Sequence, residues 1–488
     1  MSNFTLTSFI TLFSCCLLSS VSAADALKTN SPAPAANALP QHSLIDSLDG
    51  PVTANELKVF GDLALSQPLP THNNHNNLVY GRSHQAHDLL LAMYELTGDR
   101  IYLNRLIEFS DAILACRNDT NTGSLFWTGK REATWPSGTE ISGGTNYLTT
   151  HVESGAILEM LAHCARVIID HKELWNDTVP VEDKLHLGKT YIERARSYIR
   201  ECNFTIDTFI VPWSVKTMTN GDLRLYFSES PELARLDGKA GRGGGKPIPW
   251  NQQFMLVRSL VRLADDLRAL DEDKDRIALY DKIAQGTVDW FQSTLHQTNV
   301  NGEIAYEWSY TPNDATLHYI ENSAHGSSDV EGMYVCYQSG HYGITPETMR
   351  RFANTPLLVM YQDGKFTSNV RGGGGFHGLS TAWMPLAEFR PELYKLIAEP
   401  GLKRPDLRQV RILKWKNGHS TSGEPQIVSM RPVNAVAVET PAATPNQPFA
   451  PATANPAPEP RVTEPLPVAK SNAPKKSTLV SLPTGFRH

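Results

Sequence analysis

The chain has 488 residues, of which 41% are hydrophobic and 20% charged, a balance that supports a large buried core and excludes wholesale disorder. Lys and Arg number 45 against 51 Asp and Glu, which gives a net charge of −6. No polybasic run interrupts the sequence, so the composition argues against a surface that neutralises nucleic-acid phosphates. We therefore expect no nucleic-acid partner.

The first 23 residues predict a secretory signal peptide. They contain no charged side chain, are mostly apolar from Phe9 to Val21, and end in the small-residue pattern Val21-Ser22-Ala23. The apolar stretch is short for a membrane span, and no later run of about 18 apolar residues follows it. We expect a secreted or periplasmic protein with residues 1–23 removed and no membrane span.

The two ends of the mature chain have compositions typical of unstructured segments. Residues 24–50 are rich in Ala, Pro, Ser and Asn and are interpreted as a linker. Residues 411–488 form a tail rich in Pro and Ala, which cannot bury enough apolar surface to fold. The sequence therefore predicts one folded catalytic domain at residues 51–410.

Four cysteines follow the signal peptide, and two interpretations of them stay open. An even number in an oxidising compartment allows disulfides, with three possible pairings. Buried free thiols are favoured, because three of the four fall inside or at the ends of predicted helices. No Cys-x-x-Cys pair indicates a metal site, and we expect neither a metal nor another cofactor. The cysteines are Cys116, Cys164, Cys202 and Cys336.

Amphipathic stretches between these ends occur in pairs separated by a turn. In the clearest pair, residues 83–96 and 101–116 flank a Thr-Gly-Asp turn, and their apolar residues recur at helical spacing. A further helix is expected near residues 53–66. The other predicted pairs are 150–169 with 181–201, 249–268 with 272–295, 329–338 with 345–361, and 376–389 with 391–399.

Neighbouring pairs must stack, because a single pair cannot bury the apolar stripe of each helix. Long, aromatic-rich loops separate the pairs, whereas an open solenoid has a tight repeat of about 34 to 47 residues. Asn220-Gly221 and Asn301-Gly302 add β-hairpin signals between the pairs. We therefore predict an all-α fold, an (α/α)5–6 toroid of helical hairpins with short β-hairpin insertions.

The junction from Tyr94 to Leu103 reads YELTGDRIYL. It resembles the hairpin turn that recurs in six-hairpin carbohydrate-active enzymes, the toroidal glycosidases and polysaccharide lyases. In architecture the resemblance covers most of residues 75–400, and in motif it covers this junction alone. It implies a polysaccharide or oligosaccharide substrate but does not choose a reaction.

Three predicted inner helices begin with a hydroxyl residue. Thr150 with Glu153 and Ser328 with Glu331 match the capping box, in which a Glu three residues after the hydroxyl bonds back to the helix start. Ser83 supplies the third hydroxyl start. Capping alone explains both Glu residues, and this is the simpler interpretation.

These helix starts place three histidines at one end of the predicted ring. His84 and His151 would occupy the first helical position, and His325 would lie in the loop before the third helix. In a toroid the corresponding ends of the inner helices surround one funnel, where the three imidazoles would converge. His151 and Glu153 are about 200° apart around a helix, so at most one of them faces the funnel.

The densest polar cluster runs from Glu321 to Asp329 and includes Asn322 and His325. It combines a base candidate, two acids, an amide and a glycine at a loop-to-helix transition, where functional groups are often presented. Tyr334 follows, either as a half-buried core aromatic or as a proton donor. We interpret the cluster as part of a catalytic site, with a purely structural role as the alternative.

Further candidates for substrate binding lie at helix starts and in loops. Arg82 and His84 open the first predicted helix, and Trp250 suits a sugar ring, because C–H faces stack on an aromatic surface. A buried loop anchor is the alternative for the tryptophan. Residues 372–375 are glycines that either close a lid carrying His377 or supply positive φ in a surface loop. The set is completed by Tyr147, Asn251 and Asn322.

The leading hypothesis is a lyase that cleaves a uronic-acid-containing glycan by β-elimination. This reaction needs a base beside the sugar carboxylate, a proton donor to the leaving oxygen and a group that neutralises the carboxylate. The acidic composition of the chain counts against a polyanionic substrate unless the funnel is locally basic. The candidates are His151 or His325 as the base, Tyr334 or Tyr147 as the donor, and Arg82 with Asn251 or Asn322 as the neutralising groups.

Two alternatives belong to other classes. A glycoside hydrolase on the same fold would use two carboxylates, about 5–5.5 Å apart for retention or 6.5–9.5 Å for inversion. Asp329 and Glu321, with Glu153 or Asp88, are the candidates for that pair. A non-catalytic glycan-binding envelope protein would instead line a groove with tryptophans and use its histidines as caps or core residues.

Overall fold

The computed structural model of the protein describes residues 44–120, 125–136, 150–233, 244–314, 317–403 and 406–419. All of them belong to one of two units of the chain, Met1–Val428, and the other unit is Ser429–His488. The predicted signal peptide, most of the predicted linker and tail, and Tyr147 lie outside the described residues. The described residues are mostly helical, with three short two-stranded sheets, so the all-α prediction is confirmed.

The first helical pair lies close to its prediction. α3 (Arg82–Thr97) ends at Gly98, whose φ of 66° lies in the left-handed region that glycine adopts without strain. Asp99 then caps α4 (Arg100–Ala115), because its carboxylate accepts the Ile101 N–H at 2.9 Å. The Thr-Gly-Asp turn therefore reverses the chain as the sequence predicts.

Other helices precede and follow this pair. α1 (Ala54–Leu65) begins with a capping box made by Thr53 and Glu56. The other α-helices are α2 (His75–Val79), α5 (Gly155–Asp170), α6 (Tyr191–Thr205), α7 (Val211–Ser214), α9 (Trp250–Leu270), α10 (Lys274–Thr294), α11 (Ser323–Ser339), α12 (Pro346–Asn354), α13 (Leu393–Leu402) and α14 (Val410–Gly418). The 3₁₀ helices are η2 (Val152–Ser154), η3 (Lys172–Leu174), η7 (Thr381–Glu388) and η8 (Leu407–Gln409), and the π-helical segments are η4 (Ile206–Ile210) and η6 (Thr355–Met360).

The strands form three antiparallel hairpins in the loops between helical pairs. The two predicted hairpin signals are confirmed, because Gly221 and Gly302 lie in the turns of the first two hairpins. The hairpins pair β1 (Val215–Thr217) with β2 (Leu223–Leu225), β3 (His296–Val300) with β4 (Glu303–Glu307), and β5 (Tyr361–Gln362) with β6 (Lys365–Phe366).

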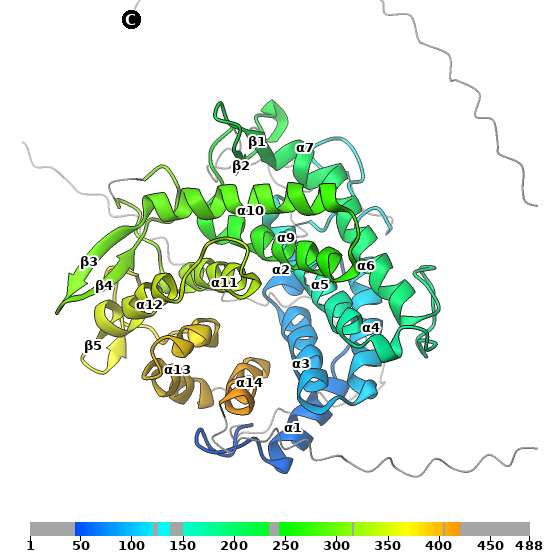
Figure 1. The fold of residues 1–488 in the computed structure, drawn as a ribbon, viewed down its shortest axis with the longest axis horizontal. Coiled ribbons are helices and arrows are strands. Elements are labelled where there is room, and N and C mark those ends of the chain that lie inside the picture. Colours follow the sequence, from blue (N-terminus) through cyan, green and yellow to red (C-terminus); the bar gives the residue numbers. More distant parts are fainter. Residues whose placement is uncertain are drawn as a thin grey trace, which may run out of the picture. The chain divides into compact units, whose positions relative to one another are not determined.

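Two sets of helices, inner and outer, make up the described structure (Figure 1). Contacts link α3 to α5, α5 to α9, α9 to α11, α11 to η7, η7 to α14, and α14 back to α3. Outside these, α4 packs against α3, α6 against α5, α10 against α9, α12 against α11, and α13 against η7. α1 packs against both α3 and α4.

The two ends of the inner helices differ in their connections. Short turns follow the C-terminal ends of α3, α9 and α11, at residues 98–99, 271–273 and 340–345. Longer connections lead into the N-terminal ends of α9, α11 and η7, and these connections carry the three β-hairpins. Loops border the N-terminal end, and loops carry binding residues disproportionately often.

Both predicted domain boundaries need correction. α14 continues the folded part beyond residue 410, and the buried ammonium of Lys416 on α14 pairs with buried Glu56 of α1 at 2.5 Å. The predicted linker is folded from Leu44, whose N–H donates to the Gln409 side chain at 2.9 Å. Both segments are too short to show a clear period in the sequence, and both are held by contacts with distant parts of the chain.

The core contains four fully buried tryptophans and the four cysteines. All four cysteines are buried and free, as the favoured interpretation predicted. No helix among the described residues is both long and apolar enough to cross a membrane. The tryptophans are Trp135, Trp250, Trp308 and Trp383.

Candidate functional site

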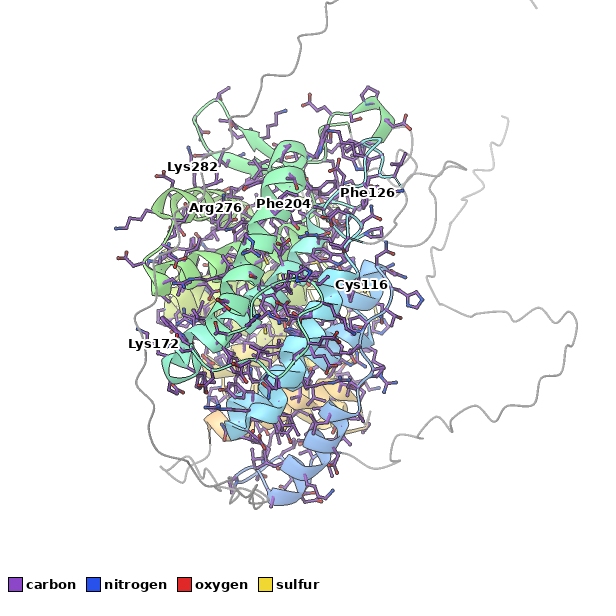
Figure 2. All side chains as sticks on the ribbon, turned by 90° about the vertical axis from the view of Figure 1, so that its right-hand side faces the viewer. Cys116, Phe126, Lys172, Phe204, Arg276 and Lys282 are labelled. Atoms are coloured by element: carbon purple, nitrogen blue, oxygen red, sulfur yellow. The ribbon has the colours of Figure 1, made fainter. Side chains whose placement is uncertain are left out.

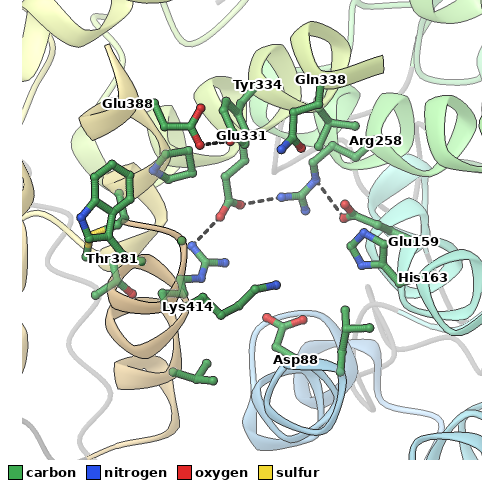
Figure 3. Close-up of a pocket in the computed structure, with 18 of the residues that line it drawn as sticks. Asp88, Glu159, His163, Arg258, Glu331, Tyr334, Gln338, Thr381, Glu388 and Lys414 are labelled. Atoms are coloured by element: carbon green, nitrogen blue, oxygen red, sulfur yellow. Dashed lines mark hydrogen bonds and ion pairs between the residues drawn. The ribbon is translucent and has the colours of Figure 1, made fainter. Parts of the chain in front are cut away.

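A cavity lies at the centre of the inner helices, and we call it the axial cavity (Figure 3). Its larger C-terminal lobe has a volume of about 400 Å³ and is lined by later parts of the inner helices. Its smaller N-terminal lobe, of about 200 Å³, is lined by residues near the helix starts, such as Ala156 and Ala324. The residues that line both lobes are His84, Asp88, Arg258, Glu331, Thr381, Val410 and Arg411.

A chain of ion pairs runs along the wall of the axial cavity. The Arg258 guanidinium lies 2.5 Å from Glu331 and 3.0 Å from Glu159, so it joins α9 to α11 and α5 (Figure 3). Arg411 of α14 also pairs with Glu331, and Arg262 pairs with Glu159 at 3.0 Å. The Arg258 side chain is only 9% exposed, and a charge this deeply buried needs an oppositely charged partner.

An imidazole and a carboxylate lie one turn apart on α3. His84 Nε2 is 3.4 Å from Asp88 Oδ2. Burial raises the pKa of Asp88, but the positive charges of His84, Arg411 and Lys414 lower it more, and the net pKa is below the ordinary value. Asp88 is therefore a carboxylate at neutral pH, placed to orient the His84 ring.

The C-terminal lobe contains a tyrosine that is hydrogen-bonded to an acid and a histidine that is uncharged at neutral pH. The Tyr334 hydroxyl donates to Glu388, and burial with this acid raises the pKa of the phenol far above its ordinary value. Burial, helped by nearby Arg262, holds the pKa of His163 well below its ordinary value. At neutral pH this lobe therefore presents a phenol and an uncharged imidazole.

The N-terminal lobe has a positive bias. Arg258, Arg408 and Arg411 line it together with two acids, Asp88 and Glu331, while Asp406 pairs with Arg408 from outside. The N-terminal ends of inner helices also border it, and such ends carry a partial positive charge. The lobe is therefore suited to a negatively charged group of a ligand.

The predicted cluster at the start of α11 contains a buried acid pair, Glu321 and Asp329, both 0% exposed. Asp329 accepts the Trp308 indole N–H at 2.8 Å, and Glu321 accepts the Asn322 N–H at 2.8 Å. Burial raises the pKa of Glu321 to about 8, and burial together with Glu321 raises the pKa of Asp329 well above its ordinary value. The pair therefore retains protons at neutral pH and is shielded from any large substrate.

His325 lies beside this pair instead of in the axial cavity. Its Nδ1 is 2.8 Å from the Asn322 amide nitrogen and 3.5 Å from Glu321. Burial lowers its pKa, although the side chain is 44% exposed. Its ring packs 5.2 Å from the Tyr310 ring. The predicted convergence of His84 and His325 on one cavity is wrong.

The helix starts explain why this convergence fails. α11 begins six residues earlier than predicted, because Asn322, and not Ser328, is its N-cap. Asn322 accepts the N–H groups of Ala324 and His325 at 3.0 Å, so His325 lies inside the first turn. Glu331 therefore lies in the middle of α11 and caps nothing.

The other two predicted starts are also wrong. Gly81 is the N-cap of α3, so Ser83 is an internal residue whose hydroxyl accepts from the Asn77 amide. Glu153 accepts the His151 N–H at 3.0 Å and lies in η2, ahead of α5. His151 is buried against the Phe227 ring at 4.7 Å and does not line the axial cavity.

The predicted substrate-binding residues divide into three groups. His84 lines both lobes, and Tyr334, predicted as a proton donor, lines the C-terminal lobe. Trp250 and Asn251 are buried at the start of α9, so the buried-anchor alternative applies to the tryptophan. Three remain, and none of them lines either lobe: Asn322 caps α11, while Arg82 and His377 are exposed. The Arg82 side chain donates to Gln67, and the His377 N–H donates to the Phe366 carbonyl.

The glycine run before His377 supports the surface-loop interpretation. Gly372, Gly374 and Gly375 have φ values between 81° and 89°, which only glycine adopts readily. The backbone of Ser368 donates to the carbonyls of Gly373 and Gly375, which fixes the turn. These hydrogen bonds define one conformation of the loop.

Several cavity residues escaped the sequence analysis, because they lie in the middle of helices. Glu159 interrupts the buried, mostly apolar face of α5, and Arg258 interrupts the buried face of α9. A charged residue on the apolar face of a helix is rare unless it is paired, so Glu159 and Arg258 are signals of the ion pairs that the sequence does carry. The others are Arg262, Arg411 and Lys414.

No group of three or more His, Cys, Asp or Glu side chains within the described part of the chain is arranged to hold a metal ion. The chain was also compared with known proteins. No protein family, no curated protein and no solved structure matches it.

Proposed function

We propose that the protein is a carbohydrate-active enzyme built on an (α/α)6 toroid. The succession of contacts from α3 through α5, α9, α11, η7 and α14 back to α3 supports a closed ring. The sixth hairpin would combine α14 with α1, the two segments joined by the Lys416–Glu56 pair. The ring would place residues from distant parts of the sequence around one cavity.

The proposed reaction is β-elimination on a uronic-acid-containing glycan. A base removes the proton at C5 of the uronate, the bond from C4 to the glycosidic oxygen breaks, and a C4–C5 double bond forms. A donor protonates the leaving oxygen. The intermediate is accessible only if the sugar carboxylate is neutralised, because the negative charge then spreads into it.

The N-terminal lobe offers a group for each role. Arg411 and Arg258 are the proposed carboxylate-binding residues, His84 is the proposed base, and Asp88 orients it. Tyr80 lines the same lobe, is 52% exposed, and is the proposed proton donor. This replaces the donor assignment of Tyr334, which lines only the C-terminal lobe.

One observation carries the proposal: an imidazole–carboxylate pair and two arginines line the same lobe at the N-terminal end of the inner helices. The whole chain is acidic, but binding depends on the local field, and three arginines line this lobe. Export to the periplasm or the exterior is part of the proposal and depends on the sequence of residues 1–23.

The test is turnover by the purified protein on polygalacturonate, alginate and hyaluronan, with dextran as a neutral control. A lyase gives products with the ultraviolet absorbance of an unsaturated uronate on at least one acidic polymer and none on dextran. Arg411→Gln should lower kcat/KM on that polymer, because the sugar carboxylate loses its partner. Absence of the absorbance on all acidic polymers would contradict the proposal.

A glycoside hydrolase is the second candidate function. Four carboxylates line the axial cavity, namely those of Asp88, Glu159, Glu331 and Glu388. Two of them, Glu159 and Glu331, are already paired with arginines, which makes them poorer nucleophiles or bases. New reducing ends without ultraviolet absorbance in the same assay would identify this reaction.

A further inference from the structure

Two exposed aromatic residues stand on the loops that lead into the N-terminal ends of α11 and η7. Tyr319 is 64% exposed and Phe376 is 50% exposed, although rings of this size are usually at least partly covered. Tyr319 precedes α11, and Phe376 precedes η7. We call these two residues the aromatic rim.

Backbone pairing links the two loops. The Tyr310 N–H donates to the Tyr319 carbonyl at 2.8 Å, Asn322 pairs with Asn369, and Thr367 pairs with Phe376. These bridges hold both rim residues on one irregular layer of loops. Shortly after the rim residues, Ala324 and Ser380 line the N-terminal lobe of the axial cavity. Each rim residue therefore lies only four or five residues before a residue that lines the proposed site.

Each rim residue has a lysine or a histidine side chain beside its ring. Lys365 Nζ lies 5.9 Å from the centre of the Phe376 ring. The His318 ring lies 4.6 Å from the Tyr319 ring. An aromatic surface packs against the C–H face of a sugar, and an adjacent cation pairs with a carboxylate on that sugar.

The size of the N-terminal lobe limits how much of a glycan it encloses. Its volume of about 200 Å³ is below the range of about 300–1,000 Å³ that encloses a drug-sized ligand. A polymer bound there must extend over the surrounding surface. The loops with the aromatic rim are part of that surface.

We propose that the aromatic rim, with Lys365 and His318, binds uronate residues of the glycan that extend beyond the axial cavity. The inference rests on the proposed function, because it names how the same site holds a longer substrate. It predicts that the enzyme prefers acidic polymers to short acidic oligosaccharides. A hydrophobic protein partner on the rim would instead be insensitive to the charge of Lys365.

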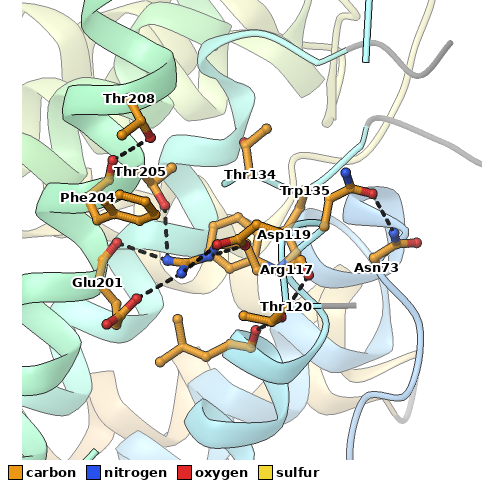
Figure 4. Close-up of polar contacts among 12 residues, drawn as sticks. Asn73, Arg117, Asp119, Thr120, Thr134, Trp135, Glu201, Phe204, Thr205 and Thr208 are labelled. Carbon is orange, nitrogen blue, oxygen red and sulfur yellow. Dashed lines mark hydrogen bonds and ion pairs between the residues drawn. The ribbon is translucent and has the colours of Figure 1, made fainter. Parts of the chain in front are cut away.

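Phe204 provides a matched control. It is 45% exposed on α6, at the side of the helical set (Figure 2), and the Arg117 guanidinium lies 5.4 Å from its ring centre. Arg117 is held by Asp119 and Glu201, so this pair of ring and cation has a local structural role (Figure 4). Phe204 lines neither lobe of the axial cavity.

The experiment measures binding of the full chain to polygalacturonate, alginate and hyaluronan by affinity electrophoresis, with dextran for comparison. We expect Phe376→Ala and Tyr319→Ala each to weaken binding to the preferred acidic polymer by about three- to tenfold. Lys365→Gln should weaken binding to the acidic polymer, and Phe204→Ala should leave it unchanged. Melting temperatures of all four variants confirm folding.

The outcomes separate this inference from the proposed function. If the rim variants bind the acidic polymers as tightly as Phe204→Ala does, the inference is overturned, even if turnover establishes the lyase. Weaker binding by the rim variants without turnover on any polymer would support the rim and contradict the lyase. A wild-type protein that binds none of the acidic polymers, or a Lys365→Gln variant with unchanged binding, also overturns the inference.

Discussion

Two acids on α11, Asp329 and Glu331, meet opposite environments. They are two residues apart, about 200° around the helix, so they face different sides. Glu331 faces the axial cavity and pairs with Arg258 and Arg411. Asp329 faces the packed side, where its partners are the indole of Trp308 and a second acid, Glu321.

This difference shows that burial alone does not decide the charge of an acid. Glu331 keeps two guanidinium partners while its side chain is only 16% exposed. Asp329 is fully buried and has no guanidinium partner among the described residues, and its pKa is raised well above the ordinary value by burial and by Glu321. Glu331 in the axial cavity is therefore ionised, whereas the buried acid pair is protonated.

The largest stability effect is expected where the chain of ion pairs is cut. Arg258→Gln removes the buried cation that Glu159 and Glu331 share. We expect a loss of about 3–5 kcal/mol in the free energy of unfolding. Urea denaturation measures it. Lys58→Gln, which removes an exposed pair with Asp62, should change stability by less than about 0.5 kcal/mol. Equal effects of the two variants would refute the role of Arg258.

A smaller contrast is expected between the two acids themselves. Glu331→Gln removes the charge that two arginines share and should cost about 1.5–3 kcal/mol. Asp329→Asn replaces a neutral acid with a neutral amide that still accepts from Trp308, so its cost should be below about 1 kcal/mol. Equilibrium unfolding at pH 7 compares them, and the reverse order would show that the assignment of charge is wrong.

The pH dependence of stability sharpens the same comparison. The pKa of Glu321 is raised from 4.5 to about 8 by burial, so the folded state holds a proton that the unfolded state releases. This contribution is fully present below about pH 4.5 and is lost as the pH rises through about 8. Melting temperatures of the wild type should fall over this window more steeply than those of Glu321→Gln. Parallel curves would contradict the protonated pair.

The sequence predicted the helical pairs better than the site. The pair around Gly98 is clear, because helical periodicity and turn chemistry agree there. The sequence predicts α14 as part of the tail, because α14 has few apolar residues and they are buried only by contact with α1, α3 and η7. Long-range contacts of this kind are not encoded in local periodicity.

The predicted site at the start of α11 is misplaced because of a local sequence pattern. Ser328 with Glu331 matches a capping box, but the same tetrapeptide also fits the middle of a helix that Asn322 caps. This error moved His325 toward the cavity and hid the role of Glu331. The three arginines of the N-terminal lobe come from α9, η8 and α14, and only the packing of these helices brings them together.

The central claim is that His84 acts in the axial cavity as the base of a β-elimination. The most direct test is the rate of unsaturated uronate formation by His84→Asn, per folded molecule, beside His296→Asn, which changes an exposed residue on β3 outside the cavity. We predict a loss of about 100-fold or more for His84→Asn and wild-type turnover for His296→Asn. Wild-type turnover by a folded His84→Asn protein would contradict the account.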